Sequence, residues 1–135
     1  MQPIKVVLRY TDGTVIKGFT QNFSPVRKNF HFHPVDTYEN SNWPIEISVN
    51  DLKAVFFVKD FAGNSLYNER KEHFEGDPPS GRKVEVKFMD GEVMVGSTLS
   101  YDSNRSGFFI FPADPNSNNI KAFIVNSSVI RVDYL

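Results

Sequence analysis

The sequence predicts an all-β protein made of two small barrels in tandem, and three observations predict it. The chain repeats itself once, each copy begins with a segment that alternates apolar and polar residues, and an Asp-Gly pair follows each of these segments. The chain also contains 13 Phe, a residue that suits a pleated, half-buried surface better than a helix. Because the chain has only 135 residues, we expect each barrel to be very small.

The repeat covers most of the chain, and an internal repeat indicates a duplicated structural unit. Residues 5–18 align without a gap with residues 83–96. The matches continue in order and, after a slightly longer loop in the first copy, resume at Asn40 with Asn116 and include Val49 with Val125. We therefore expect a first barrel at residues 1–60, a linker at 61–82 and a second barrel at 83–135. The matched pairs along the way are Thr20 and Thr98, Phe23 and Tyr101, Arg27 and Arg105, Phe30 and Phe108, Pro34 and Pro112, and Asp36 and Asp114.

Each copy predicts five strands, for the same reasons in both. The first strand alternates apolar and polar residues, as a strand with one solvated face does, and the Asp-Gly pair after it predicts a tight hairpin. An isolated Gly inside the second strand indicates a bulge or a bend. A Pro ends the third strand because proline cannot donate to a ladder, and a short polar connection separates the fourth from the fifth. The predicted strands are residues 5–10, 14–23, 29–33, 45–49 and 53–58, and then 83–88, 92–101, 107–111, 121–125 and 129–134.

The segment between the copies has a different composition. Residues 59–82 are rich in charge, Gly and Pro, which predicts irregular structure. Residues 64–74 are the one candidate for a short helix within it.

Composition and charge exclude several classes of protein. The net charge is -1, and broad binding to nucleic-acid backbones needs a dense cationic surface. There is no Cys, so disulfides and thiolate zinc sites are excluded. No signal-peptide pattern opens the chain, and no apolar run approaches the roughly 20 residues of a membrane span. We therefore expect a soluble, cytoplasmic protein that does not associate with a membrane.

The order of these elements resembles the Sm-like, SH3-type small barrel. The D-G-x-x-x-x-G spacing of that family occurs twice, at Asp12-Gly13 with Gly18 and at Asp90-Gly91 with Gly96. Tyr101-Asp102 also matches the aromatic–acidic pair that closes the second strand of the family. The resemblance implies two Sm-like barrels. It also implies RNA-binding loops near residues 23–29, 50–54, 101–107 and 126–130, which carry only part of the expected basic and aromatic set.

The whole chain also resembles a bacterial family of uncharacterised function that is sometimes attached to PilZ cyclic-dinucleotide domains. Residues 52–61 and 107–115, followed by Asn118-Asn119, carry this resemblance. It implies a bacterial signalling or regulatory context and no particular activity.

Two loops hold the candidate ligand-binding residues. Arg27 and Arg105 are the basic residues at equivalent loop positions, where they could bind an anion or a partner's carboxylate or form ion pairs with Asp36 and Asp114. Asp102 and Asn104 belong to a segment, residues 102–107, that approaches the D-x-S-x-x-G motif of PilZ domains. No R-x-x-x-R motif precedes that segment, and its residues also suit a plain turn.

His31 and His33 lie two residues apart on one predicted strand face, where Asp36 or His73 could complete a metal site. Their equivalents in the second copy are Phe109 and Phe111, which favours barrel wall over metal ligands. The sequence shows no nucleophile–base pair and no phosphate loop. We therefore expect neither a metal nor another cofactor and no enzymatic activity.

The sequence favours a non-enzymatic interaction module. We expect a protein partner, bound through exposed strand edges, in a bacterial regulatory or signalling context. The alternative is binding of RNA or a nucleotide, including a cyclic dinucleotide, through the loops that carry Arg27 and Arg105. Homo-oligomers are compatible with either function.

Overall fold

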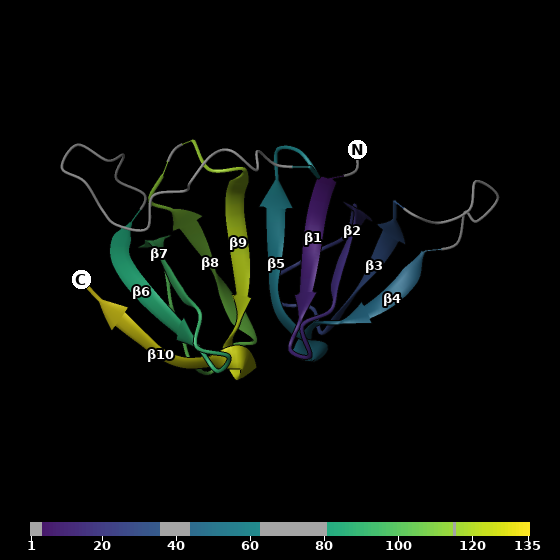
Figure 1. Cartoon of the computed structure of the whole chain (residues 1–135). Helices are drawn as coiled ribbons and strands as arrows, with labels where there is room; N and C mark the ends of the chain where they lie inside the picture. Colours follow the sequence, from purple (N-terminus) through teal and green to yellow (C-terminus); the bar gives the residue numbers. More distant parts are fainter. Residues whose placement is uncertain (1–3, 36–43, 63–80, 115) are drawn as a thin grey trace.

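The computed structural model describes residues 4–35, 44–62, 81–114 and 116–135, and these form one antiparallel sheet of ten strands (Figure 1). The all-β prediction is confirmed. A single 3-10 turn precedes the last strand of each half. The predicted helix at residues 64–74 lies outside the described residues. The elements are β1 (Ile4–Tyr10), β2 (Val15–Thr20), β3 (Asn29–Pro34), β4 (Ile45–Ser48), η1 (Val49–Asp51), β5 (Leu52–Val58), β6 (Arg82–Phe88), β7 (Val93–Thr98), β8 (Gly107–Pro112), β9 (Asn119–Val125), η2 (Asn126–Ser128) and β10 (Val129–Tyr134).

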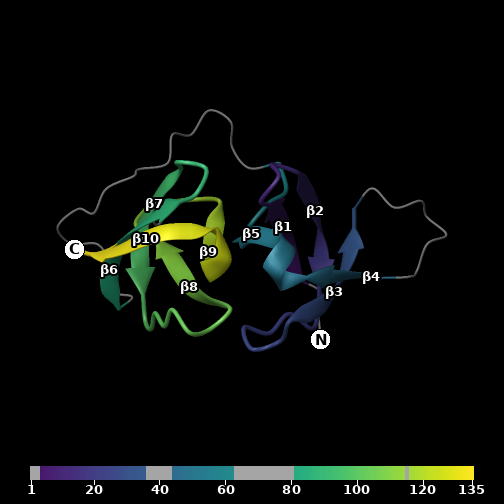
Figure 2. The same cartoon turned by 90° about the horizontal axis from the view of Figure 1, so that it is seen from below.

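The order of the strands shows the duplication. The sheet runs β10-β6-β7-β8-β9-β5-β1-β2-β3-β4. In the first five strands of the chain the order is β5-β1-β2-β3-β4, and in the last five it is β10-β6-β7-β8-β9, which is the same arrangement. We call β1–β5 the first half and β6–β10 the second half. The halves lie side by side and meet where β5 of the first half is next to β9 of the second (Figure 2). The expectation of two tandem barrels is not confirmed, because β5 pairs with β9 and carries one sheet through both halves.

Strand β5 explains why the halves merge. All seven of its residues are buried, and a strand buried on both faces reads as a nearly continuous apolar run. Its Val55 and Phe57 belong to the core of the first half, whereas Phe56 and Val58 belong to the core of the second. Strand β9 behaves in the same way, since Phe123 enters the first core and its neighbours Ala122 and Ile124 the second. The two central strands are thus shared by both cores.

The predicted hairpins are present at both Asp-Gly pairs. Gly13 and Gly91 adopt φ angles of 93° and 91°, a region that favours glycine. The Asp12 carboxylate accepts a hydrogen bond from the backbone N–H of Thr14 at 2.8 Å. The equivalent bond in the second half, from the N–H of Glu92 to Asp90, measures 2.9 Å.

Gly18 and Gly96 allow a close approach between strands. A Cβ atom on Gly18 would lie 2.2 Å from the carbonyl oxygen of His33, and one on Gly96 would lie 2.3 Å from that of Phe111. The pairings of β1 with β2 and of β6 with β7 run through these glycines without a register shift. The predicted irregularity is therefore a close contact with the next strand and not a bulge.

Strand pairing corrects one match in the repeat. Val125 pairs with Gly107, and Ser48 pairs with Asn29, which is the first-half equivalent of Gly107. Ser48, and not Val49, is therefore the structural equivalent of Val125. Val125 is apolar because its side chain packs in the core of the first half, whereas Ser48 is only half-buried.

Candidate functional site

The segment 102–107 is a hydrogen-bonded turn. The backbone N–H of Asn104 donates to the Asp102 side chain at 2.9 Å, and that of Arg105 donates to the Asp102 carbonyl at 3.1 Å. The Asn126 side-chain amide donates to the carbonyls of Asp102 and Arg105 at 3.0 and 2.8 Å. This turn chemistry accounts for the likeness of the segment to a nucleotide-binding motif.

The two candidate arginines lie on equivalent turns. The Arg27 N–H donates to the Ser24 carbonyl at 3.2 Å, as that of Arg105 does to Asp102. The Arg105 guanidinium lies 3.7 Å from the Asp102 carboxylate, and its side chain is 67% exposed. Asp114 is buried and accepts a hydrogen bond from the N–H of Asn116. Asp36, the other expected ion-pair partner, lies outside the described residues.

The turns of the β2–β3 and β7–β8 loops lie on the same side of the molecule (Figure 2) and border a pocket of about 210 Å³. We call it the phenylalanine pocket. Of the four candidate site residues, the structure brings Asp102 and Arg105 into this pocket, while Arg27 and Asn104 do not line it. The first half contributes Pro25. The other lining residues are Thr98, Leu99, Ser100, Gly107, Phe108, Phe109, Phe111 and Phe123.

Aromatic packing holds the β2–β3 loop in place. Phe23, at the start of the β2–β3 loop, makes edge-to-face contacts with Phe57 at 5.6 Å and Phe123 at 5.1 Å between ring centroids. Such contacts stabilise beyond the area they bury. Val26, which follows the pocket-lining Pro25 in the chain, is 80% exposed, and Leu99, which lines the pocket, is 75% exposed. Sequence reasoning missed both, because a single apolar residue in a loop carries no periodic signal.

A larger cavity, of about 870 Å³, lies on the opposite face of the central strands. It is lined by Phe56 and Val58, which alternate with the residues that face the first core. We call it the front groove. The outer faces of β1 and β2 supply Val7, Arg9, Val15 and Lys17, and two connecting segments supply Lys59, Asp60, Phe61, Ala62, Asn116 and Asn118, with Asn119 from β9.

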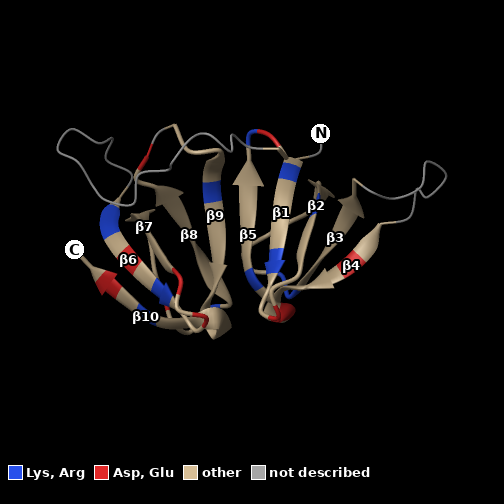
Figure 3. Cartoon of the chain, viewed as in Figure 1, with Lys and Arg blue, Asp and Glu red and all other residues tan. Residues whose placement is uncertain are grey.

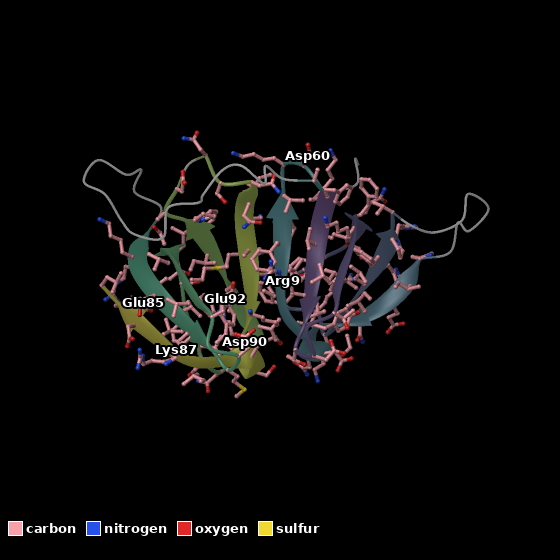
Figure 4. The ribbon with its side chains drawn as sticks, in the orientation of Figure 1. Arg9, Asp60, Glu85, Lys87, Asp90 and Glu92 are labelled. Carbon is pink, nitrogen blue, oxygen red and sulfur yellow. The ribbon has the colours of Figure 1, made fainter. Side chains whose placement is uncertain are left out.

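Below the groove a polar cluster joins the halves. Lys53, whose side chain is 8% exposed, lies 2.7 Å from the Asp90 carboxylate and also forms an ion pair with Glu92. The Arg9 guanidinium lies 3.8 Å from Glu92 across the junction (Figure 4). The hydrogen bond from Lys53 lowers the pKa of the Asp90 carboxyl below its ordinary value of 3.8, and the N–H of Glu92 lowers it further.

The candidate histidine metal site lies only in part within the described residues, because Asp36 and His73 are outside them. His31 is exposed, and its ring nitrogen Nδ1 lies 3.3 Å from the Asn22 amide. Among the residues that the structure describes, no three His, Asp or Glu side chains gather so that they could hold a metal ion.

The comparison with known proteins yields a family without an assigned function. Residues 2–135 match a family of unknown function, DUF6982. The chain belongs to this family. No functionally curated protein and no solved structure is significantly similar to it. The DUF6982 match spans both halves of the chain. Within the described ranges no helix is long and apolar enough to cross a membrane.

Proposed function

We propose that this DUF6982 protein is a non-catalytic module that binds a protein partner through the phenylalanine pocket. The observation that carries the proposal is the combination of an apolar pocket with exposed apolar residues on both loops beside it. Partner-binding surfaces use such pockets to receive a single large side chain, which then supplies much of the binding energy. A volume of about 210 Å³ suits one Leu, Met or aromatic side chain of a partner.

The charges at the pocket add selectivity. Asp102 and Arg105 lie 3.7 Å apart and are both partly exposed, so a partner can replace this weak surface pair with charges of its own. Apolar anchors beside charged residues are typical of a protein interface. The likeness of the sequence to chains attached to PilZ domains supports a bacterial signalling setting for such a module.

Strand addition at the sheet edges has less support. In the part of the chain that the structure describes, β4 and β10 each have one neighbouring strand. Strand β4 carries exposed Glu46 and follows Pro44, and β10 carries the ion pair of Arg131 and Asp133 at 2.6 Å. Charges and proline on an edge strand discourage pairing with another chain. The phenylalanine pocket therefore replaces the edges as the proposed contact surface.

The test is a selection of binding peptides with the full chain, followed by calorimetry on the variant Val26→Asp/Leu99→Asp. Both side chains are mostly exposed, so the fold tolerates the change. We expect selected peptides to share one large apolar residue and the variant to bind them at least tenfold more weakly, since a hot-spot contact is worth about 2 kcal/mol or more.

The matched control is Met89→Asp/Ile130→Asp, which replaces two other exposed apolar residues, neither of which lines the pocket. It should bind the peptides as the wild type does. Peptides that bind both variants equally, or that share no apolar anchor, would overturn the proposal.

A further inference from the structure

The front groove carries positive charge that the chain as a whole does not. Its lining includes the cations Arg9, Lys17 and Lys59 and the single carboxylate Asp60, whereas the net charge of the chain is -1. Figure 3 shows basic positions at both ends of β1 and at the end of β5, while acidic and basic positions alternate along β6 and β10. The positive charge is thus concentrated along the first half's side of the groove.

The Arg9 guanidinium is held against the Phe56 ring, and its N–H groups make no hydrogen bond to a described residue. The guanidinium lies 5.2 Å from the centroid of the Phe56 ring, a distance at which a cation is attracted by the ring face. The Glu92 carboxylate, at 3.8 Å, is too far away for a hydrogen bond. No described residue accepts a hydrogen bond from this guanidinium, and its side chain is 45% exposed. A planar fork of free donors suits a phosphate group.

Lys17 provides a second cation on the same surface. Its residue pairs with Val7 on β1, two positions from Arg9, so both side chains leave the same face of the sheet. The ammonium donates to the Phe61 carbonyl at 2.8 Å. Among the described residues no carboxylate lies within ion-pair distance of it. The equivalent position in the second half is Val95, so this pair of cations is found in the first half alone.

Aromatic and amide groups complete the lining. Phe61 packs edge-on against Phe19 with ring centroids 5.3 Å apart, and it lines the groove directly after Lys59 and Asp60. At the same end lie Asn116 and Asn119, whose side-chain amides have no hydrogen-bond partner among the described residues. A flat ring can pack against Phe61, and the amides can donate to and accept from its polar edge.

We propose that the front groove binds a small phosphate-bearing ligand of nucleotide size, with its phosphates between Arg9 and Lys17 and its ring against Phe61. A volume of about 870 Å³ lies in the range of small-ligand sites. The near-neutral chain and its interrupted cationic surface suit a small ligand better than a nucleic acid, which needs an extended basic stripe. The site is separate from the phenylalanine pocket, with which it shares no lining residue.

The experiment is calorimetric titration of the full chain with ADP, with inorganic pyrophosphate and with a single-stranded oligonucleotide. We expect ADP to bind and pyrophosphate to bind more weakly. Arg9→Gln and Lys17→Gln should each weaken ADP binding roughly tenfold, the loss expected for one charge-assisted hydrogen bond. Phe61→Ala should weaken the binding of ADP and leave that of pyrophosphate unchanged.

The matched control is Lys87→Gln, because Lys87 pairs with Arg131 as Arg9 pairs with Ala54 and is the second half's equivalent of Arg9. It should bind ADP within twofold of the wild type. Circular dichroism and thermal unfolding verify that each variant folds, and Lys17→Gln provides the test should Arg9→Gln unfold. Absence of ADP binding, equal losses in Lys87→Gln, or binding of the oligonucleotide alone would overturn the proposal. Peptides that bind the phenylalanine pocket should bind equally well with and without ADP. The peptide proposal and the ADP proposal can therefore fail separately.

Discussion

At the scale of single residues, Lys53 is a side chain that connects the two halves. It belongs to β5 of the first half, yet its ammonium is held by Asp90 and Glu92 of the second and lies 4.5 Å from the centroid of the Phe88 ring. Its equivalent at the end of the sheet is Ile130, which has no second half to contact and is exposed. A buried lysine is retained only where partners offset the cost of its desolvation. Lys53 is therefore specific to the junction.

We predict that Lys53→Met lowers the free energy of unfolding by about 1–2 kcal/mol at neutral pH. The value is that of a hydrogen bond to a charged group, reduced because both carboxylates are partly exposed. The pKa of Asp90 is lowered in the folded state. Its contribution is therefore complete above the ordinary carboxyl pKa of 3.8 and is lost as the pH falls through the folded value.

Urea unfolding of Lys53→Met and of the wild type at several pH values checks this prediction. The difference in stability should shrink on acidification below the ordinary carboxyl pKa. Lys83→Met removes an exposed lysine of β6 and should leave the pH dependence as it is in the wild type. A Lys53→Met difference that stays constant down to acid pH would contradict the ion pair.

At the scale of the strands, some glycine positions could be explained from the sequence and others could not. The hairpins were predictable because Asp-Gly specifies a local backbone conformation. The glycine inside β2 or β7 signalled an irregularity, but its cause lies in another strand. The carbonyl oxygen of His33 or Phe111 occupies the place of the missing side chain. Gly91 and Gly96 are thus both required, one for its φ angle and the other for space.

We predict that Gly96→Ala is more destabilising than Gly91→Ala. A Cβ at Gly96 would lie 2.3 Å from a backbone oxygen, so the strands must separate, at a cost of about 1–3 kcal/mol or more. At Gly91 nothing lies within 4 Å of the added atom, and the cost is the roughly 1 kcal/mol of a positive φ. Denaturant midpoints of the two variants measure the difference. The reverse order would show that the β7–β8 contact is looser than described.

At the scale of the whole molecule, the junction between the halves is apolar and the outer ends of the sheet are polar. At the junction the second half presents Phe109 and Phe123 to the first core. Strand pairing makes His31 and Glu46 their first-half equivalents, and both are exposed. The difference between His31 and Phe109, which from sequence alone could have marked a metal site, follows from which copy is covered by the other. Repeat proteins place polar residues on their terminal units in the same way.

The opposite end follows the same rule. Ala54 and Phe56 of β5 face the second core, whereas their equivalents on β10 are Arg131 and Asp133. The number of strands and the hairpin turns could be predicted from the sequence, because the repeat shows them twice. The sequence did not reveal the junction, because burial of both faces of β5 depends on the other half. It did not reveal the groove, because Arg9 and Lys17 resemble the solvated side of any alternating strand.

Because the edge strands β4 and β10 are polar, we predict that the wild type is a monomer. We predict that the variant Glu46→Phe/Asp133→Phe self-associates. The changes place Phe where β9 carries Phe123 and β5 carries Phe56. The β10 edge of one molecule can then pair with the β4 edge of the next as β5 pairs with β9. Such a head-to-tail contact adds further copies, so sedimentation velocity should show species larger than a dimer at raised concentration. Thr11→Phe/Ser127→Phe adds the same two rings at exposed turns outside the phenylalanine pocket and should remain monomeric. An oligomeric wild type, or a monomeric edge variant, would show that charge on β4 and β10 does not end the sheet.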